Sequence, residues 1–368
     1  MVGVGLIGEG PLAGAYASAL AQLPDVRLVT TRSSDGGPAR CASATYEEAG
    51  ALLDARSVAS VVIVGGADAF ALTSKALLSG KHVLLSGPGA LSARQVRALK
   101  LLAESRSRLL VFGEERLLSS PVGFLRRMLA QGNGLWTPRY VRSSNVLAAR
   151  RHEALSVASL AVEDLALCLY LLDRPVLSVS AVGSRSPWDA AAFLNVTFAG
   201  GVLAALHVSL AEAWESCQLV VALADKMLLL DEWDPRAPLK VISNGSGHAG
   251  RESYRIHGMR DRALTEGSRP YATDGAARPV REQCRRFVEA VALEDLSKGN
   301  AEFWVRVVGV WEAAEASMAE GGVPIAVEPQ APEKSEARRS APLLRLVHSG
   351  GSRRESTLPR PSLTLVGG

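Results

Sequence analysis

The feature that most constrains the fold is an alternation of short apolar runs with longer helical stretches from residue 2 to about residue 122. The runs that we predict to be buried strands are Val2–Ile7, Arg27–Thr31, Ser60–Val64, His82–Leu85 and Leu109–Phe112. The helical stretches between them include Leu12–Leu23, Ala67–Leu78 and Ala93–Glu104. Repeated strand–helix–strand units of this kind form a parallel sheet with helices on both faces. The pattern therefore predicts a doubly wound α/β domain over residues 1–122.

After about residue 135 the pattern changes to a strand, a long helix over Ser156–Leu172 and then several closely spaced strands. Apolar and polar residues alternate on both sides of Gly200–Gly201, which predicts a β-hairpin with one buried face. Two helices, Val280–Leu293 and Ala301–Ala319, are expected to follow this sheet. We therefore predict a second, α+β domain with an open, mainly antiparallel sheet over residues 123–327. The Arg-, Ser- and Pro-rich tail, residues 328–368, is expected to be largely disordered and is a candidate partner-binding segment.

The composition narrows the class of protein. A chain of 368 residues with 48% hydrophobic residues can fill the cores of two globular domains. The net charge of +4 is mild, so we expect no nucleic-acid partner. The four cysteines are widely separated, which favours free thiols over disulfides and speaks against a metal site. No apolar stretch is long enough to span a bilayer and no signal peptide is recognisable, so we expect a cytoplasmic protein without membrane contact.

A glycine-rich turn follows the first predicted strand directly. Its residues are Gly8, Glu9, Gly10, Pro11, Leu12 and Ala13, which fit the pattern G-x-G-x-x-[GA] at a junction of strand and helix. In this pattern the first glycine makes the tight turn, the second lets a pyrophosphate approach the backbone, and the third small residue lets the helix pack on the strand. The turn predicts a Rossmann dinucleotide site, although glycines that only shape the turn remain the alternative.

The end of the second strand bears on which nicotinamide cofactor would bind. Sites that prefer NAD usually place an acidic residue there to hold the ribose 2′-hydroxyl. This strand instead ends in Thr30–Thr31 followed by Arg32, Ser33 and Ser34. Arg32 can pair with a 2′-phosphate and Ser33 can donate a hydroxyl, so the sequence favours NADP(H) over NAD(H), with a solvated loop arginine as the alternative.

Further segments form a recognisable series along the chain. They are Ala76–Leu84, Tyr170–Val176, Ala199–Val202 and Glu312–Ser317. Together with the glycine turn they resemble the Gfo/Idh/MocA family of oxidoreductases, and the resemblance extends from Val2 to about Val327. It implies NAD(P) bound to the first domain, a sugar-like substrate at the sheet of the second, and a homo-oligomer formed through that sheet. It also places Gly65, Gly66, Ser86 and Pro88 at the cofactor.

The chain departs from this family at the catalytic positions. Ser86–Gly87–Pro88 stands where the family has Glu-Lys-Pro, and Ser159 and Glu163 stand where it has an aspartate and a histidine. Acid–base catalysis needs a titratable group within hydrogen-bond reach, and glycine supplies none. The candidates for this role are Glu163 and His152, and we also note Glu114, Glu115 and Arg116 after the fifth strand. The alternatives are a carboxylate in polar surroundings for Glu163 and a solvated loop residue for His152.

Three functions remain open. The first is an oxidoreductase with altered catalytic groups that acts on a sugar-like or other carbonyl or imine substrate. The second is a pseudoenzyme with a regulatory or assembly role through protein partners. A third, weaker one is a hydrolase that uses NAD in redox-assisted elimination, and it would also need a base near the sugar.

Overall fold

The computed structural model describes residues 1–31, 42–46, 48–66, 68–130, 136–148, 155–184, 190–234, 237–244, 254–258 and 277–327. The predicted tail and three candidate site residues, Arg32, Ser33 and His152, lie outside these described residues.

The first sheet, within the described part of the chain, is parallel and has the order β3-β2-β1-β4-β5-β6. Its strands are β1 (Val2–Ile7), β2 (Val26–Thr31), β3 (Ala44–Tyr46), β4 (Ser60–Ile63), β5 (His82–Leu85) and β6 (Leu110–Phe112). The helices between them are α1 (Gly10–Ala21), α2 (Ala49–Asp54), α3 (Ala69–Leu78) and α4 (Ala93–Ser105). β4 and β5 are buried at every position, which explains why they appear in the sequence as continuous apolar runs. The predicted doubly wound fold is confirmed, and the strand order reverses between β1 and β4.

The second sheet has the order β14-β13-β12-β11-β7-β10-β9-β8-β15 among the described residues. Its strands are β7 (Tyr140–Ala148), β8 (Val176–Ser184), β9 (Ala191–Phe198), β10 (Leu203–Ser209), β11 (Ala211–Ala222), β12 (Lys226–Asp231), β13 (Leu239–Asn244), β14 (Tyr254–Gly258) and β15 (Ile325–Ala326). β7 and β10 pair in parallel and the other neighbours pair antiparallel. The predicted hairpin is β9–β10, and Gly200 and Gly201 at its turn have φ angles of +83° and +77°. The open, mainly antiparallel sheet is therefore also confirmed.

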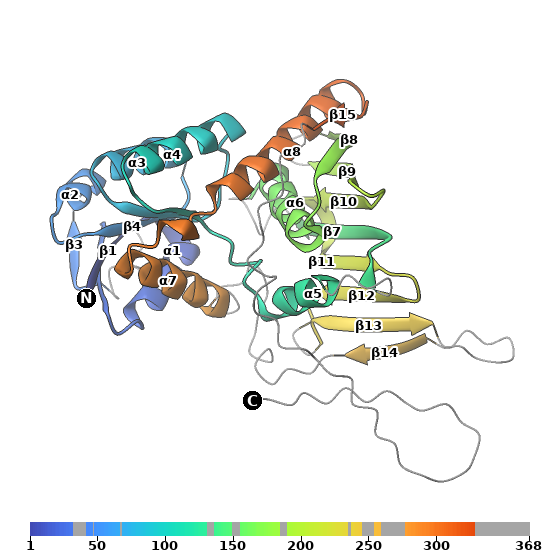
Figure 1. Cartoon of the computed structure of the whole chain (residues 1–368), viewed down its shortest axis with the longest axis horizontal. Helices are drawn as coiled ribbons and strands as arrows, with labels where there is room; N and C mark the ends of the chain where they lie inside the picture. Colours follow the sequence, from blue (N-terminus) through green and yellow to red (C-terminus); the bar gives the residue numbers. More distant parts are fainter. Residues whose placement is uncertain are drawn as a thin grey trace, which may run out of the picture. The chain divides into compact units, whose positions relative to one another are not determined.

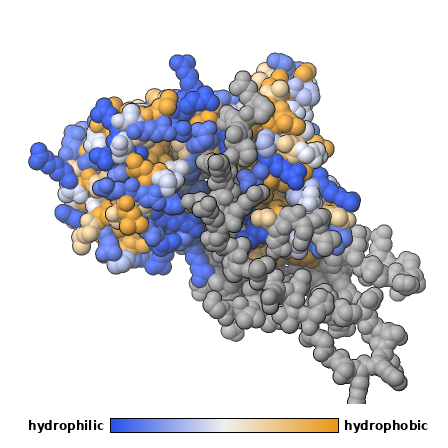
Figure 2. Space-filling view, in the orientation of Figure 1, coloured by the Kyte–Doolittle hydropathy of each residue, from blue (hydrophilic) through white to orange (hydrophobic). Residues whose placement is uncertain are grey.

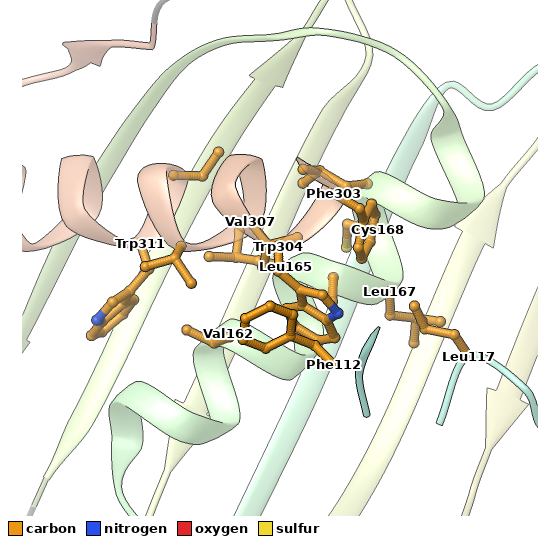
Figure 3. Packing of buried hydrophobic residues seen from close by; sticks show 14 of the residues in the cluster. Phe112, Leu117, Val162, Leu165, Leu167, Cys168, Phe303, Trp304, Val307 and Trp311 are labelled. Atoms are coloured by element: carbon orange, nitrogen blue, oxygen red, sulfur yellow. The ribbon is translucent and has the colours of Figure 1, made fainter. Parts of the chain in front are cut away.

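Three helices cover one face of the second sheet (Figure 1). They are α5 (Ser120–Ala130), α6 (Val157–Leu172) and α8 (Ala301–Ala319), and a short 3-10 helix, η4 (Leu296–Lys298), precedes α8. Figure 3 shows Trp304 of α8 together with Leu165 of α6 and Phe112 of β6. A single hydrophobic cluster therefore joins α6 and α8 to the first sheet.

The helix α7 (Ala277–Ala292) corrects one expectation from the sequence. We expected it to complete the second domain, because it follows that sheet in the chain. Instead it packs on α1 and β1, and Val280, Cys284 and Phe287 share a hydrophobic cluster with Tyr16 and Leu20 of α1. The chain thus returns to the first sheet after it has built the second.

The surface seen in Figure 2 mixes hydrophilic and hydrophobic residues over the part that is not drawn in grey. None of the helices in the described part of the chain is long and apolar enough to cross a membrane.

Candidate functional site

The glycine turn lies between β1 and α1, and its two glycines meet different surroundings. Gly8 has a φ angle of +148°, and a Cβ atom there would lie 2.6 Å from the carbonyl oxygen of Val64 at the end of β4. Gly10 has a φ angle of +81°, and no described heavy atom lies within 4 Å of the position that its Cβ would take. Gly8 is therefore required by packing, whereas Gly10 borders open space.

The first turn of α1 has the features of an anion site. Helix α1 begins at Gly10, Pro11 lies in its first turn, and the N-cap residue Glu9 makes no side-chain capping bond. Ala13 is fully buried, while Leu12 is exposed. The N–H groups at a helix N-terminus and the helix dipole favour a phosphate group. Because Gly10 adds no side chain in front of them, the turn fits a dinucleotide pyrophosphate.

The ends of β4 and β5 lie beside this turn. Gly65 and Gly66 have φ angles of +68° and +99°, and the Gly65 N–H donates to Ser86 Oγ at 3.2 Å. Gly87 has a φ angle of +80°, and no described heavy atom lies within 4 Å of its Cβ position. Pro88 is buried, and its carbonyl accepts the Leu91 N–H at 3.0 Å. The residues predicted to contact a cofactor, so far as the structure describes them, thus share the carboxyl edge of the sheet, where doubly wound proteins bind ligands.

Glu115, in the loop after β6, brings a carboxylate to this edge. Its Oε1 atom lies 2.9 Å from the point where a Cβ on Gly113 would stand, and the Gly87 nitrogen lies 3.0 Å from the same point. The Tyr16 hydroxyl, from α1, donates a hydrogen bond to Glu115 Oε1. Burial raises the pKa of Glu115, and the bond from Tyr16 opposes part of that rise. The structure therefore brings helix α1 and the loops after β5 and β6 together around one partly buried acid.

The next residue, Arg116, points to the second sheet instead. Its guanidinium pairs with Asp164 of α6 and, at 2.8 Å, with Glu232 after β12. It also donates to the Cys217 sulfur at 3.2 Å. Asp164 is fully buried and accepts further bonds from Ser143 Oγ at 2.6 Å and from the Asn145 amide at 3.2 Å. The residues of this buried ion cluster are Arg116, Ser143, Asn145, Asp164, Cys217 and Glu232.

Glu163, the catalytic candidate on α6, and Ser159 lie in different surroundings. Glu163 is half-buried, whereas its neighbour Asp164 is the carboxylate that enters the interior. Ser159 closes the helix N-terminus, since its hydroxyl donates to the Ser156 carbonyl at 2.7 Å and accepts the Ser156 N–H at 3.0 Å. That hydroxyl is thus engaged in a capping box.

Two partnerships were missed from the sequence. Tyr16 lies inside an apolar helix pattern, so nothing in the local sequence distinguishes it from an ordinary core residue. Asp164 interrupts a strongly apolar helix, and a charge at such a position is a usable signal of a buried partner. The sequence placed its partner, Arg116, in a loop but gave no sign of the ion pair.

Comparison with known proteins supports the fold. No protein-family model and no curated protein matches the sequence. UDP-N-acetylglucosamine 3-dehydrogenase GnnA from Acidithiobacillus ferrooxidans is similar in structure, with 20% identity, a TM-score of 0.69, and coverage of 87% of this chain and 99% of its own. Levoglucosan dehydrogenase in complex with NADH has 15% identity, a TM-score of 0.74, and coverage of 89% and 100%. GenD2 from gentamicin A biosynthesis in complex with NAD has 19% identity, a TM-score of 0.70, and coverage of 89% and 96%.

At these identities the likeness establishes the fold. It is the fold of the Gfo/Idh/MocA-type oxidoreductases, as the resemblance in the sequence implies.

Proposed function

We propose that the protein is an oxidoreductase that binds a nicotinamide dinucleotide at the carboxyl edge of the first sheet. The observation that carries the proposal is the glycine turn, where Gly10 leaves open space in front of the N-terminus of α1. Gly8 to Ala13 would hold the pyrophosphate, and Gly65, Gly66, Ser86 and Pro88 would line the path of the second nucleotide. The bound cofactor supplies the hydride chemistry, and the protein binds and orients it.

The substrate that we propose is a sugar-like compound, or another compound with a carbonyl or imine carbon. Two neighbours of the same fold are named as dehydrogenases of a nucleotide sugar and of levoglucosan. This supports a polyhydroxylated substrate class for this chain and leaves the individual compound to be found by a screen.

The form of the cofactor is a separate proposal. The residues after β2 contain no acid and include Arg32 and Ser33, which favours NADP(H). The two neighbours described with a cofactor contain NADH or NAD, which favours NAD(H). We therefore propose that both forms bind and that Arg32 contributes to affinity for the 2′-phosphate. The substitution Arg32→Ala is expected to weaken the binding of NADPH and to leave the affinity for NADH unchanged.

The first experiment is a titration of the cofactor-stripped protein with NADH and NADPH, followed by nicotinamide fluorescence. The Gly10→Asp variant is expected to lose binding, since its carboxylate would occupy the space for the pyrophosphate and repel its charge. Gly14→Ala is the matched control, because Gly14 lies on the same helix and no described heavy atom lies within 4 Å of its Cβ position. Equal binding by Gly10→Asp and wild type would overturn the proposed site.

A second candidate function has its own observation. Gly87 supplies no side chain, and the Ser159 hydroxyl is engaged in the helix cap. Two family positions that usually carry acid–base groups are thereby unavailable for proton transfer, which favours a pseudoenzyme that binds a cofactor without turnover. A screen of levoglucosan and UDP-N-acetylglucosamine with NAD(P)+ separates the two, because turnover of either compound excludes the pseudoenzyme.

Self-association through the second sheet is also part of the proposal. Val182 pairs with Phe193 and Phe193 with His207 across β8, β9 and β10, so these side chains share one face. Val182 and Phe193 are 53% and 49% exposed, and the ring of Phe193 stacks on His207. We expect light scattering to report an oligomer and Phe193→Lys to shift it toward the monomer. A wild-type monomer at micromolar concentration would contradict this expectation.

We also propose a cytoplasmic location for the protein and a protein partner for its tail. Cys168, Cys217 and Cys284 are buried free thiols, which supports the proposed cytoplasmic location. A protein partner for the tail, residues 328–368, stays a prediction from composition.

A further inference from the structure

The direction in which a dinucleotide would lie follows from the strand order. In doubly wound sheets the adenosine ribose is recognised at the end of the second strand, and the pyrophosphate lies at the first. β2 lies on one side of β1, and β4, β5 and β6 lie on the other. The nicotinamide half would therefore extend over the ends of β4, β5 and β6, toward Gly87 and Glu115.

Glu115 is fixed at that end by contacts from two directions. The Tyr16 hydroxyl of α1 donates a hydrogen bond to the carboxylate, and the carboxylate lies against Gly113, as the Gly87 nitrogen does. The Gly113 and Gly87 N–H groups both donate to the Leu85 carbonyl, at 2.6 and 2.7 Å, so the two loops are tied together. The carboxylate consequently has a defined position between α1 and the loop after β6.

The described neighbouring groups do not place a positive charge beside the Glu115 carboxylate. Burial raises the pKa of Tyr16 and of Cys284, so both stay neutral near pH 7. In the same loop, Arg116 pairs with Asp164 and Glu232, and Glu114 accepts a bond from Asn300 at 3.2 Å. Glu115 differs from Glu114 in that its carboxylate contacts Tyr16 and lies against Gly113, which places its charge on the side of the proposed nicotinamide end.

We propose that Glu115 sets the preference of this site between the oxidised and the reduced cofactor. The inference rests on the proposed cofactor binding and goes beyond it by assigning a role to a residue outside the expected motifs. The oxidised nicotinamide ring carries a positive charge and the reduced ring is neutral. An ionised carboxylate near the ring stabilises the first and is indifferent to the second. Tyr16 is the positioning residue that keeps the carboxylate in place.

The proposal also predicts a proton linkage. Because ionised Glu115 attracts the oxidised ring, binding of NAD+ favours loss of the Glu115 proton, whereas binding of NADH does not. Affinity for NAD+ therefore rises with pH as Glu115 ionises, and affinity for NADH stays level. Removal of the Tyr16 hydroxyl takes away a bond that stabilises the carboxylate, so Tyr16→Phe moves the rise to higher pH.

The experiment measures dissociation constants of the full chain for NAD+ and NADH by calorimetry between pH 6 and pH 9, and repeats them with NADP+ and NADPH. The test variant is Glu115→Gln, which keeps the shape and the acceptor for Tyr16. The matched control is Glu114→Gln, the neighbouring glutamate in the same loop. We expect Glu115→Gln to lower the affinity for the oxidised cofactor by about tenfold at pH 8, equal to about 1.4 kcal/mol. The affinity for the reduced cofactor should stay within about twofold of the wild-type value.

Each result decides the matter. A loss confined to the oxidised form in Glu115→Gln, absent in Glu114→Gln, supports the assignment. An equal change for both forms, or none, overturns it while the cofactor site stands. If Glu115→Gln does not fold by circular dichroism, the pH shift in Tyr16→Phe decides in its place. If wild type binds no nicotinamide nucleotide, the proposed function and this inference fall together.

Discussion

At the scale of single residues, the same amino acid is used for different reasons within one turn. Gly8 is needed because a Cβ atom would meet the Val64 carbonyl at 2.6 Å, while Gly10 faces open space. Substitution of Gly8 should therefore lower the stability of the fold, whereas substitution of Gly10 should weaken binding of the cofactor.

The Gly8→Ala variant is expected to lower the free energy of unfolding by about 1–3 kcal/mol, through backbone strain and the contact with Val64. Gly14→Ala, in the interior of α1, is expected to raise it by about 0.5–1 kcal/mol. Urea denaturation of both variants checks the pair. A Gly8→Ala protein as stable as wild type would contradict the packing argument.

Glu115 also makes a prediction for stability. Its pKa is raised in the folded protein by burial, so the unfolded chain loses this proton at a lower pH than the folded chain. The contribution of this group is complete below the ordinary glutamate pKa and is lost as pH rises through the raised value. Melting temperatures between pH 4 and pH 8 should therefore fall less steeply in Glu115→Gln than in wild type. Parallel slopes would refute this, and Glu114→Gln serves again as control.

At the scale of elements, hydrogen bonds from Lys81 link the start of β5 to the loop before β4. Its ammonium group donates to the carbonyls of Ala55 and Val58 at 2.8 and 2.7 Å. The following residue, His82, accepts the Leu109 N–H at 3.0 Å. These bonds give two residues of the family-like segment a structural role at the amino end of β5.

Substitution of Lys81 by Met is expected to destabilise the fold by about 2 kcal/mol, because two carbonyls lose a charged donor. Lys100→Met is the control, since Lys100 forms exposed pairs with Glu104 and Glu302, and such pairs contribute about 0–1 kcal/mol. Thermal unfolding followed by circular dichroism compares them. Equal costs would show that the buried bonds add nothing.

At the scale of the whole molecule, the buried ion cluster links the loop after β6 to α6 and to the second sheet. Arg116 reaches Asp164 and Glu232, which come from distant parts of the chain. The hydrophobic cluster around Trp304 crosses the same boundary. Both features predict that the two sheets unfold together.

The Asp164→Ala variant tests this link. It leaves the Arg116 charge with less compensation in a largely buried place, so we expect a loss of about 3–5 kcal/mol. Glu289→Ala, which breaks an exposed pair with Arg285, should cost less than about 1 kcal/mol. Differential scanning calorimetry would show one lowered transition for Asp164→Ala. Two separate transitions in wild type would contradict the cooperative view.

The sequence by itself determined the elements whose signals are local. β1, β5 and α8 have the predicted bounds, and β2, β4, β6 and α6 differ by one residue at one end. Continuous apolar runs mark buried parallel strands, and the glycine turn is a local requirement of backbone geometry. The fold and the place of the glycine turn could therefore be predicted before any contact was known.

Only the tertiary structure decided which surfaces meet. An amphipathic pattern shows that α7 has an apolar face, and it does not show that the face packs on α1. In the same way, Glu163 and Asp164 are equivalent carboxylates in the sequence, and the rotation of α6 selects Asp164 for burial beside Arg116. The pairing of Tyr16 with Glu115 joins residues 99 positions apart. Such contacts depend on the assembled sheet, because no local interaction brings their partners together.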